Sequence, residues 1–267
     1  NDVVKNSRNL VINKGDNLIP RIENAKIKAN IDAIKLAKKL NGEPATPAQM
    51  EVLKRYIGWG GLSSVFKRDH QYYEDLKKVL NQAEYESARE STTTSFYTPV
   101  DLIDTIWTAV KKLGFKGGNV LDPSAGIGHF YGVMPQDIRQ KSNLSAIELD
   151  EISGLILKSM YPDSKNNVAG FEDVQIPNNS LDLVITNVPF GTFKLHDSKE
   201  KDISKFNIHD FFIAKSIRKL KPGGLGVFVT TTSTLDRGDE LRRWLANEGN
   251  ADVIDAFRLN TDTFKSN

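Results

Sequence analysis

The sequence predicts an α/β fold in which helices cover both faces of a mostly parallel sheet, with a helical N-terminal satellite in front of it. From Pro99 onward, short apolar segments alternate with stretches of helical periodicity, which is typical of βαβ units. A glycine-rich turn follows the first apolar segment. Residues 1–20 are polar and irregular, and the residues between them and 93 show helical patterns without strand signals. We therefore predict a satellite over 1–92 and a main Rossmann-like domain over 93–267, joined at the Ser/Thr linker 91–94.

The satellite sequence predicts four helices. Apolar residues recur at helical spacing up to Leu40, and Asn41-Gly42 ends that helix. Thr46-Pro47 begins the next one, with proline at its first position. Gly58-Trp59-Gly60-Gly61 is too rich in glycine for a helix or strand interior, and we expect Trp59 to pack the satellite against the main domain. The expected helices span 25–40, 47–56, 71–80 and 82–90.

The main domain is expected to contain six strands and four helices. The strands are predicted near 119–121, 144–147, 166–169, 182–186, 225–230 and 252–257, and the helices near 100–113, 151–160, 208–220 and 238–247. We read 221–224 as the turn that enters a later strand. Sheets of this kind bind ligands at the carboxyl ends of their strands, where the strand order reverses. The functional residues should therefore follow strands directly.

The composition suits an ordinary globular protein, with 39% hydrophobic and 26% charged residues. A net charge of +2 permits a nucleic-acid partner without indicating one. The absence of cysteine excludes disulfides and thiolate metal sites, so we expect no metal, and it fits a cytoplasmic protein. No apolar run approaches the roughly 20 residues that cross a bilayer, so no membrane partner is expected. The chain does not begin with Met, and we predict that it is part of a longer polypeptide.

The loop after the first predicted strand suits a positively charged ligand. Asp122 ends the strand, and the loop residues that follow it include Pro123, Ala125, Gly126 and Gly128. A dinucleotide site would show Gly-x-Gly-x-x-Gly with its amides facing a pyrophosphate, whereas an anionic Asp122 would repel one. S-adenosylmethionine carries both an ammonium and a sulfonium. We therefore predict S-adenosylmethionine as the cofactor.

Two further segments are expected beside this loop. Glu148 follows the second apolar strand, and an acid there can bind both hydroxyls of a ribose. The alternative is that Glu148 only caps the next helix. Tyr97-Thr98-Pro99 precedes a helix, with Thr98 as the predicted cap and Pro99 at the first helical position. The free amides there can also hold the carboxylate of the cofactor.

The segment Asn187-Val188-Pro189-Phe190 directly follows a buried strand and suits the methylation of an aryl amine. The lone pair of adenine N6 is delocalised, and two acceptors on its N–H bonds localise it. The Asn187 side-chain oxygen and the Val188 carbonyl can be those acceptors, while Pro189 holds the turn. Phe190 can stack on a base that has left the duplex, worth about 1–3 kcal/mol. The alternative is a tight turn with Phe190 in the core, which the order of the other segments disfavours.

Together these segments resemble the N6-adenine DNA methyltransferases, and more narrowly the methyltransferase domains of large helicase–methyltransferase proteins of phages and conjugative elements. The resemblance covers nearly the whole chain. The matching segments are 56–62, 96–99, 122–130, 147–150, 170–172, 187–191, 208–210 and 221–224.

The resemblance implies the roles of most site residues. Thr98, Asp122, Gly126 and Glu148 would bind S-adenosylmethionine, Phe171 and Glu172 would flank its adenine, and residues 187–190 would be catalytic. Val188 stands where proline is commoner, which predicts a less rigid turn. The implied partner is DNA, and a helicase region is expected elsewhere in the polypeptide.

A long loop over 191–207 follows the tetrapeptide and is rich in lysine. We expect its lysines to meet DNA phosphates, although acids at 197, 200 and 202 dilute the charge and a solvated surface loop explains it equally well. The lysines concerned are Lys194, Lys199, Lys201 and Lys205.

Other functions remain open at this stage. Similar tetrapeptides serve methyltransferases that act on RNA bases or on protein glutamine, since those targets are also planar amines or amides. A third reading is a non-catalytic module that binds DNA or the cofactor. A nicotinamide dehydrogenase fits least well, because Asp122 stands where a pyrophosphate would lie.

Overall fold

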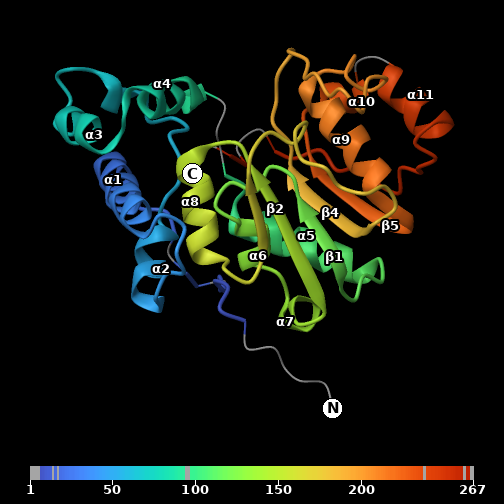
Figure 1. Ribbon diagram of the computed structural model, residues 1–267, viewed down its shortest axis with the longest axis horizontal. Coiled ribbons are helices and arrows are strands. Elements are labelled where there is room, and N and C mark those ends of the chain that lie inside the picture. Colours follow the sequence, from blue (N-terminus) through green and yellow to red (C-terminus); the bar gives the residue numbers. More distant parts are fainter. Residues whose placement is uncertain are drawn as a thin grey trace.

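The computed structural model describes residues 7–13, 15–16, 18–93, 97–236, 239–260 and 263–264. Within these residues the chain forms a five-stranded sheet in the order β3-β2-β1-β4-β5, and every pairing is parallel. Figure 1 shows the sheet at the centre of the molecule. The strands are β1 (Gly118–Asp122), β2 (Ser142–Glu148), β3 (Lys165–Val168), β4 (Leu181–Asn187) and β5 (Leu220–Val229). The predicted α/β class and parallel sheet are confirmed.

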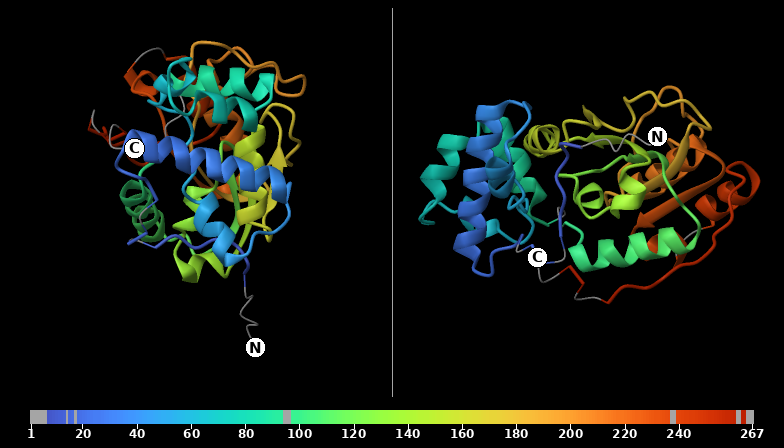
Figure 2. Two further views of the ribbon diagram at one scale, coloured as in Figure 1. Left: turned by 90° about the vertical axis from the view of Figure 1, so that its left-hand side faces the viewer. Right: turned by 90° about the horizontal axis from the view of Figure 1, so that it is seen from below.

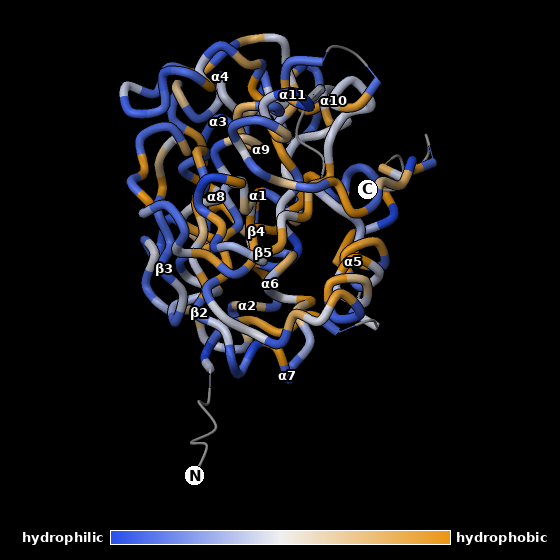
Figure 3. The backbone as a smooth tube through the Cα atoms, turned by 90° about the vertical axis from the view of Figure 1, so that its right-hand side faces the viewer, coloured by the Kyte–Doolittle hydropathy of each residue, from blue (hydrophilic) through white to orange (hydrophobic). Residues whose placement is uncertain are grey.

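Alternating residues of the central strands build a separate core on each face of the sheet. In β1, Val120 belongs to one core and Leu121 to the other, and Leu183 and Val184 in β4 divide in the same way. Successive side chains of a strand point to opposite faces, so a run that is apolar throughout indicates a strand covered on both sides. Figure 3 shows hydrophobic residues of β4 and β5 inside the molecule.

Helices cover both faces. The first face packs against α5 (Val100–Lys112), α6 (His129–Gly132), α7 (Gln136–Arg139) and α8 (Glu151–Met160). The second packs against α9 (Ile208–Lys219) and α11 (Glu240–Asn247), with the short α10 (Ser233–Asp236) nearby. Amphipathic helices explain this arrangement, since Ile103, Trp107 and Val110 of α5 share one buried stripe. Among the described residues, no helix is long and apolar enough to span a membrane.

The satellite consists of helices beside α8 (Figures 1 and 2). They are α1 (Glu23–Leu40), α2 (Pro47–Leu53), α3 (Tyr73–Val79) and α4 (Gln82–Glu90), with 3₁₀ turns at Ser63–Phe66 and Ser91–Thr93. Capping boxes begin α2 at Thr46 and α4 at Asn81. The buried isoleucines of α1 belong to the same core as α5 and α8, so one hydrophobic core joins the satellite to the sheet.

The glycine-rich turn of the satellite is held by a buried asparagine. Asn30 of α1, fully buried, donates to the Gly58 carbonyl (2.6 Å) and accepts from the Ile57 amide (2.9 Å). Gly58 adopts φ 69°, a conformation that favours glycine. Trp59 is 3% exposed, belongs to the shared core and packs edge-on against Phe66 of the satellite (5.6 Å), and its role in joining the satellite to the main domain stays a prediction.

Three local predictions are wrong. Residues 252–257 form no strand, and Val253, Ile254 and Phe257 are exposed, because no strand lies alongside them within the described residues. Pro99 is the N-cap of α5 rather than its first residue, so Thr98 does not cap the helix. Residues 221–224 are a bulge within β5 rather than a turn before it, since the β4 partners step from Leu220 to Leu225.

Candidate active site

Three polar side chains lie in a row at the carboxyl edge of the sheet. Glu148 ends β2, Asp122 ends β1 and Asn187 ends β4, and these three strands are neighbours. Neighbouring strands lie about 4.8 Å apart, so the row spans roughly 10 Å. The strand order reverses between β1 and β4, the position at which such sheets bind ligands. The fold thus brings together the residues expected to serve the cofactor and the catalytic step.

Asp122 is a buried carboxylate held in a fixed position. Its side chain is 1% exposed, accepts the Ser124 amide (3.1 Å) and lies against the Thr186 hydroxyl. Its own amide donates to the Tyr131 hydroxyl (2.8 Å), which in turn donates to the Ser145 carbonyl of β2. Burial raises the pKa of Asp122 to about 7, although both of its hydrogen bonds lower it. Tyr131 was not predicted from the sequence.

Glu148 joins the glycine loop to the start of α8. One carboxylate oxygen accepts the Gly126 amide (2.7 Å) and the other accepts the Asp150 amide (2.8 Å). Burial raises the pKa of Glu148 to about 7, against the effect of these two hydrogen bonds. The helix cap is Asp150, whose carboxylate accepts the Ser153 amide (2.8 Å), so the alternative role of Glu148 as the cap is wrong.

Tyr97-Thr98-Pro99 lies against the glycine loop. A side chain at Gly126, which has φ 55°, would meet the Tyr97 ring at 2.4 Å, so glycine permits this close approach. The Tyr97 hydroxyl is 3.5 Å from the Ser153 hydroxyl. Thr98 is 5% exposed, and Phe96 of the same segment lies outside the described residues. The remaining loop residues, Pro123, Ala125 and Gly128, are buried.

The satellite contributes a tyrosine to the edge of this site. Tyr56, 3% exposed, faces Ser153, and burial together with the negative charge of Asp150 raises the pKa of its phenol. It therefore stays neutral and can donate a hydrogen bond to Ser153, beside Glu148 and Asp150. Sequence reasoning missed Tyr56 because nothing local separates it from a core aromatic.

The tetrapeptide after β4 combines a buried anchor with an exposed ring. Val188 is 2% exposed, and its amide donates to the Val229 carbonyl of β5 (3.0 Å). A proline at 188 has no N–H and could not form this bond, so the expected loss of rigidity is compensated. Phe190 is 42% exposed, which contradicts a core role for its ring. Asn187 and Pro189 are partly buried.

Phe171 belongs to the core on one face of the sheet, whereas Ala125 and Ile127 of the glycine loop belong to the core on the other face. Phe171 is 1% exposed, with its ring 5.1 Å from that of Phe212 and 4.7 Å from the Lys215 amine. Glu172 folds its carboxylate back over Gly170. Their contact with the cofactor's adenine stays a prediction, and Phe171 also has a clear packing role.

The loop over 191–207 is fastened to α9 by its acids. Asp197 and Lys215 form an ion pair (2.7 Å) in which both side chains are 2% exposed. Burial would raise the pKa of Asp197, but its bond to Lys215 holds that pKa below the usual value. Glu200 pairs with Lys219 (2.6 Å) and with Arg218, which also binds Asp202. The acids that dilute the charge of the loop in sequence are therefore neutralised by α9.

The lysines of this loop face solvent. Lys199 donates to Gln175 (2.7 Å), Lys205 lies 5.4 Å from the Phe206 ring, and no carboxylate of the described residues pairs with any of the four loop lysines. Phe193, 57% exposed, lies in the same loop.

The chemistry of these residues fits S-adenosylmethionine. Asp122 and Glu148 have no cationic partner among the residues described, so their negative charge is available to a cationic ligand. Burial would make that charge costly without such a ligand. Among those same residues, no group of three or more potential metal ligands exists. A Rossmann-like sheet that ends in these residues has the fold and the buried carboxyl groups that suit an S-adenosylmethionine-dependent methyltransferase.

Comparison with known proteins places the chain more narrowly. The family model of the Eco57I restriction-modification methylases matches residues 9–264, and the chain belongs to that family. The chain is 27% identical over 244 residues to the Defense against restriction protein B of Escherichia phage P1, covering 90% of this chain and 9% of that protein. It is 30% identical over 156 residues to the type II methyltransferase M.TthHB8I of Thermus thermophilus, covering 52% and 35% respectively.

The chain thus spans only a small part of the curated relatives that it matches. Among solved structures, a class I S-adenosylmethionine-dependent methyltransferase from Listeria monocytogenes is 16% identical with a TM-score of 0.49, covering 84% of this chain and 72% of that one. The methyltransferase subunit of a type I restriction-modification system from Streptococcus thermophilus is 20% identical with a TM-score of 0.47, covering 79% and 50%.

Proposed function

We propose that this chain transfers a methyl group from S-adenosylmethionine to the N6 amine of an adenine that has left the DNA duplex. The observation that carries the proposal is the tetrapeptide at residues 187–190. It follows β4 beside Asp122, with Val188 anchored and Phe190 exposed. Membership in a restriction-modification methylase family supports DNA as the substrate.

The chain's residues have distinct roles in this proposal. Asp122 holds the positive end of the cofactor, and Glu148 binds its ribose. The bound cofactor supplies an electrophilic methyl group on a sulfonium. The Asn187 side-chain oxygen and the Val188 carbonyl accept hydrogen bonds from the two N–H groups of adenine N6. These bonds localise the lone pair on that nitrogen, while Phe190 stacks on the base. No strong general base is needed, because the amine proton leaves after its nitrogen has become positive.

The exposed loop lysines are proposed to bind DNA phosphates beside the extruded base. Their support is the pairing of the neighbouring acids with α9, which leaves the lysine charge uncompensated. The chain is further proposed to be one part of a longer polypeptide that contains a helicase region, since it covers 9% of the phage P1 relative.

The test is the transfer of tritium-labelled methyl groups to duplex DNA, followed by digestion to nucleosides. We expect label in N6-methyldeoxyadenosine. The variants Asn187→Ala and Phe190→Ala should lower kcat/KM by at least about 100-fold and keep S-adenosylmethionine binding, because neither residue holds the cofactor in this proposal. Label in RNA or in protein glutamine would show that those molecules, rather than DNA, are the methyl acceptors. Cofactor binding without transfer, in the full-length polypeptide, would indicate a non-catalytic module.

A further inference from the structure

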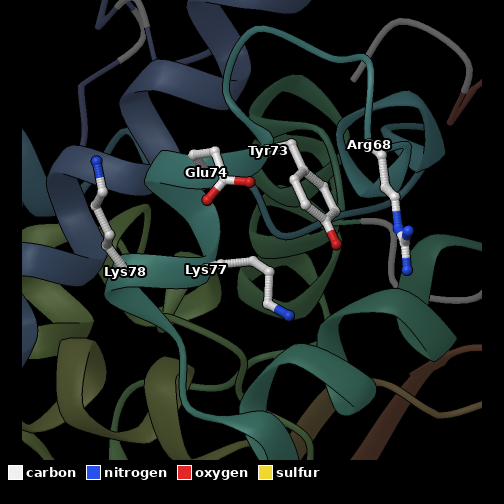
Figure 4. Close-up of a pocket in the computed structure, with 5 residues that line it drawn as sticks. All are labelled: Arg68, Tyr73, Glu74, Lys77 and Lys78. Carbon is white, nitrogen blue, oxygen red and sulfur yellow. The ribbon is translucent and has the colours of Figure 1, made fainter.

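A cationic hollow lies on the satellite, outside the site described so far. Its volume is about 510 Å³, and it is open to solvent. Helix α3 supplies most of its lining, and Arg68 enters from the segment after the 3₁₀ turn Ser63–Phe66 (Figure 4). The lining residues are Arg68, Tyr73, Glu74, Lys77 and Lys78. Three of these five side chains are cations and one is an acid.

Two tyrosine rings, those of Tyr73 and Tyr85, lie beside the Lys77 amine of this hollow. The Lys77 amine lies 6.0 Å from the centre of the Tyr73 ring and 5.5 Å from that of Tyr85 in α4. Tyr85 packs edge-on against Phe66 (5.3 Å), which packs edge-on against the buried Trp59 (5.6 Å). The chain of rings connects Tyr85, beside the hollow, to the core of the protein.

The acids near the hollow are mostly engaged, and its cations are mostly free. Asp75 pairs with Lys78 (3.6 Å), and Glu84 pairs with Lys38 (2.5 Å). Within the described part of the chain, no carboxylate forms an ion pair with Arg68, Lys77 or Arg89. Burial raises the pKa of the Tyr85 phenol, and the positive charges of Arg68 and Arg89 both oppose that rise, so both lie near Tyr85. Glu74 is the one acid of the lining, and the two unpaired cations Arg68 and Lys77 outweigh it.

The hollow is close enough to the cofactor site to contact the same DNA. Arg89, whose charge acts on Tyr85 beside the hollow, lies eight positions before Tyr97, and eight extended Cα–Cα steps span at most about 28 Å. That distance is roughly eight base-pair rises of B-DNA. A duplex held at the cofactor site can therefore reach the satellite.

We propose that this hollow binds the phosphate backbone of DNA, with Arg68 and Lys77 contacting phosphates a few base pairs away from the methylated base. This inference rests on the proposed function for its substrate. It assigns the satellite a role in holding the duplex, independent of sequence, since phosphate contacts position a protein on DNA without reading bases.

The experiment measures the affinity of the chain for a fluorescent duplex by anisotropy, over a series of salt concentrations. Each phosphate contact contributes about 0.9 to the slope of log affinity against log salt. The double variant Arg68→Gln/Lys77→Gln should therefore lower that slope by about 1.8. Calorimetry should show unchanged affinity for S-adenosylmethionine, which verifies that the fold and the cofactor site are intact.

The matched control is Lys112→Gln/Lys116→Gln, at the end of α5 and just after it, which removes the same charge from exposed positions of the main domain that form no ion pair within the described residues. It should change the slope much less. Equal slopes for the two double variants, or a wild type that does not bind duplex DNA, would overturn the inference. The tritium assay measures methyl transfer to adenine N6 in a separate experiment. DNA binding through the hollow without N6-adenine transfer would refute the proposed function alone, and transfer with an unchanged slope would refute the inference alone.

Discussion

Asp122 and Glu148 concentrate the chemistry of the site in two buried carboxyl groups whose pKa values are raised to about 7. An acid buried without a cation favours its neutral form, whereas a ligand that carries a sulfonium and an ammonium favours the ionised form. The protonation state of these two residues should therefore decide whether the cofactor binds.

The first prediction concerns the pH dependence of cofactor binding. S-adenosylmethionine affinity should fall between pH 8 and pH 6 by about tenfold for each of the two carboxyl groups that must be ionised, because a group with a pKa near 7 is mostly ionised at the first pH and mostly protonated at the second. Calorimetric titration at several pH values measures it. A constant affinity across this range would mean that neither carboxyl group holds the cofactor's charge.

The second prediction separates stability from function at Asp122. Its pKa is raised from 3.8, so the folded protein holds a proton that the unfolded chain releases, and stability falls as pH rises from about 4 to 7. Asp122→Asn should raise the free energy of unfolding at pH 8 by about 2–4 kcal/mol and abolish cofactor binding. Urea denaturation at pH 5 and pH 8 measures the first effect.

Asp182 provides the matched control. Its pKa is lowered despite partial burial, by hydrogen bonds from Lys221 (2.8 Å) and the Asn119 amide (2.7 Å). It therefore stabilises the fold above pH 4, and that contribution is lost as pH falls. Asp182→Asn should destabilise the protein slightly at pH 8, by less than about 1 kcal/mol because the pair is partly exposed. The same direction of change for both variants would contradict the assigned pKa shifts.

At the scale of elements, the sequence pattern predicts where most helices and strands lie but not which partners they find. All five observed strands fall near predicted positions. Apolar runs are the local signal for the buried strands, whereas β3 (Lys165–Val168) contains a single apolar residue. The sixth, over 252–257, has the same signal and no neighbouring strand to pair with. Strand formation depends on that neighbour, which periodicity does not report.

The site residues also fall into those that the sequence predicts and those that it does not. Asp122, Glu148 and Asn187 are recognisable because each directly follows a strand, and the parallel sheet must then bring them together. Tyr56, Tyr131 and Lys215 act through contacts between segments far apart in sequence. A lone tyrosine or lysine has no local pattern that distinguishes these roles from packing or exposure.

The buried ion pair between the 191–207 loop and α9 supports the third prediction. Removing one partner leaves the other as an uncompensated buried charge. Lys215→Met and Asp197→Asn should therefore each lower the free energy of unfolding by about 3 kcal/mol or more, and we expect the larger loss for Lys215→Met. The double variant should be less destabilised than the sum of the two. Denaturant unfolding of all four proteins measures the coupling, and additive effects would show that the loop does not depend on this pair.

At the scale of the whole molecule, the satellite and the sheet share one core although they look separable in sequence. Ile27, Ile31 and Ile34 of α1 are at most 3% exposed, and α1 makes extensive contact with α8. Helix α8 in turn begins at the polar group that surrounds Glu148. Packing in the satellite therefore bears on the geometry of the cofactor site, and Tyr56 adds a direct contact.

The fourth prediction follows from that shared core. Ile34→Ala should lower the free energy of unfolding by about 2–5 kcal/mol, because it opens a cavity at a fully buried position. If satellite and sheet unfold as one unit, the amides of α8 and β2 should lose hydrogen-exchange protection by the same free energy as those of α1. Full protection of β2 in a variant whose α1 amides exchange freely would show instead that the two parts unfold separately. In that case the boundary predicted near residue 92 would be a true domain boundary, and Tyr56 would be a contact between domains.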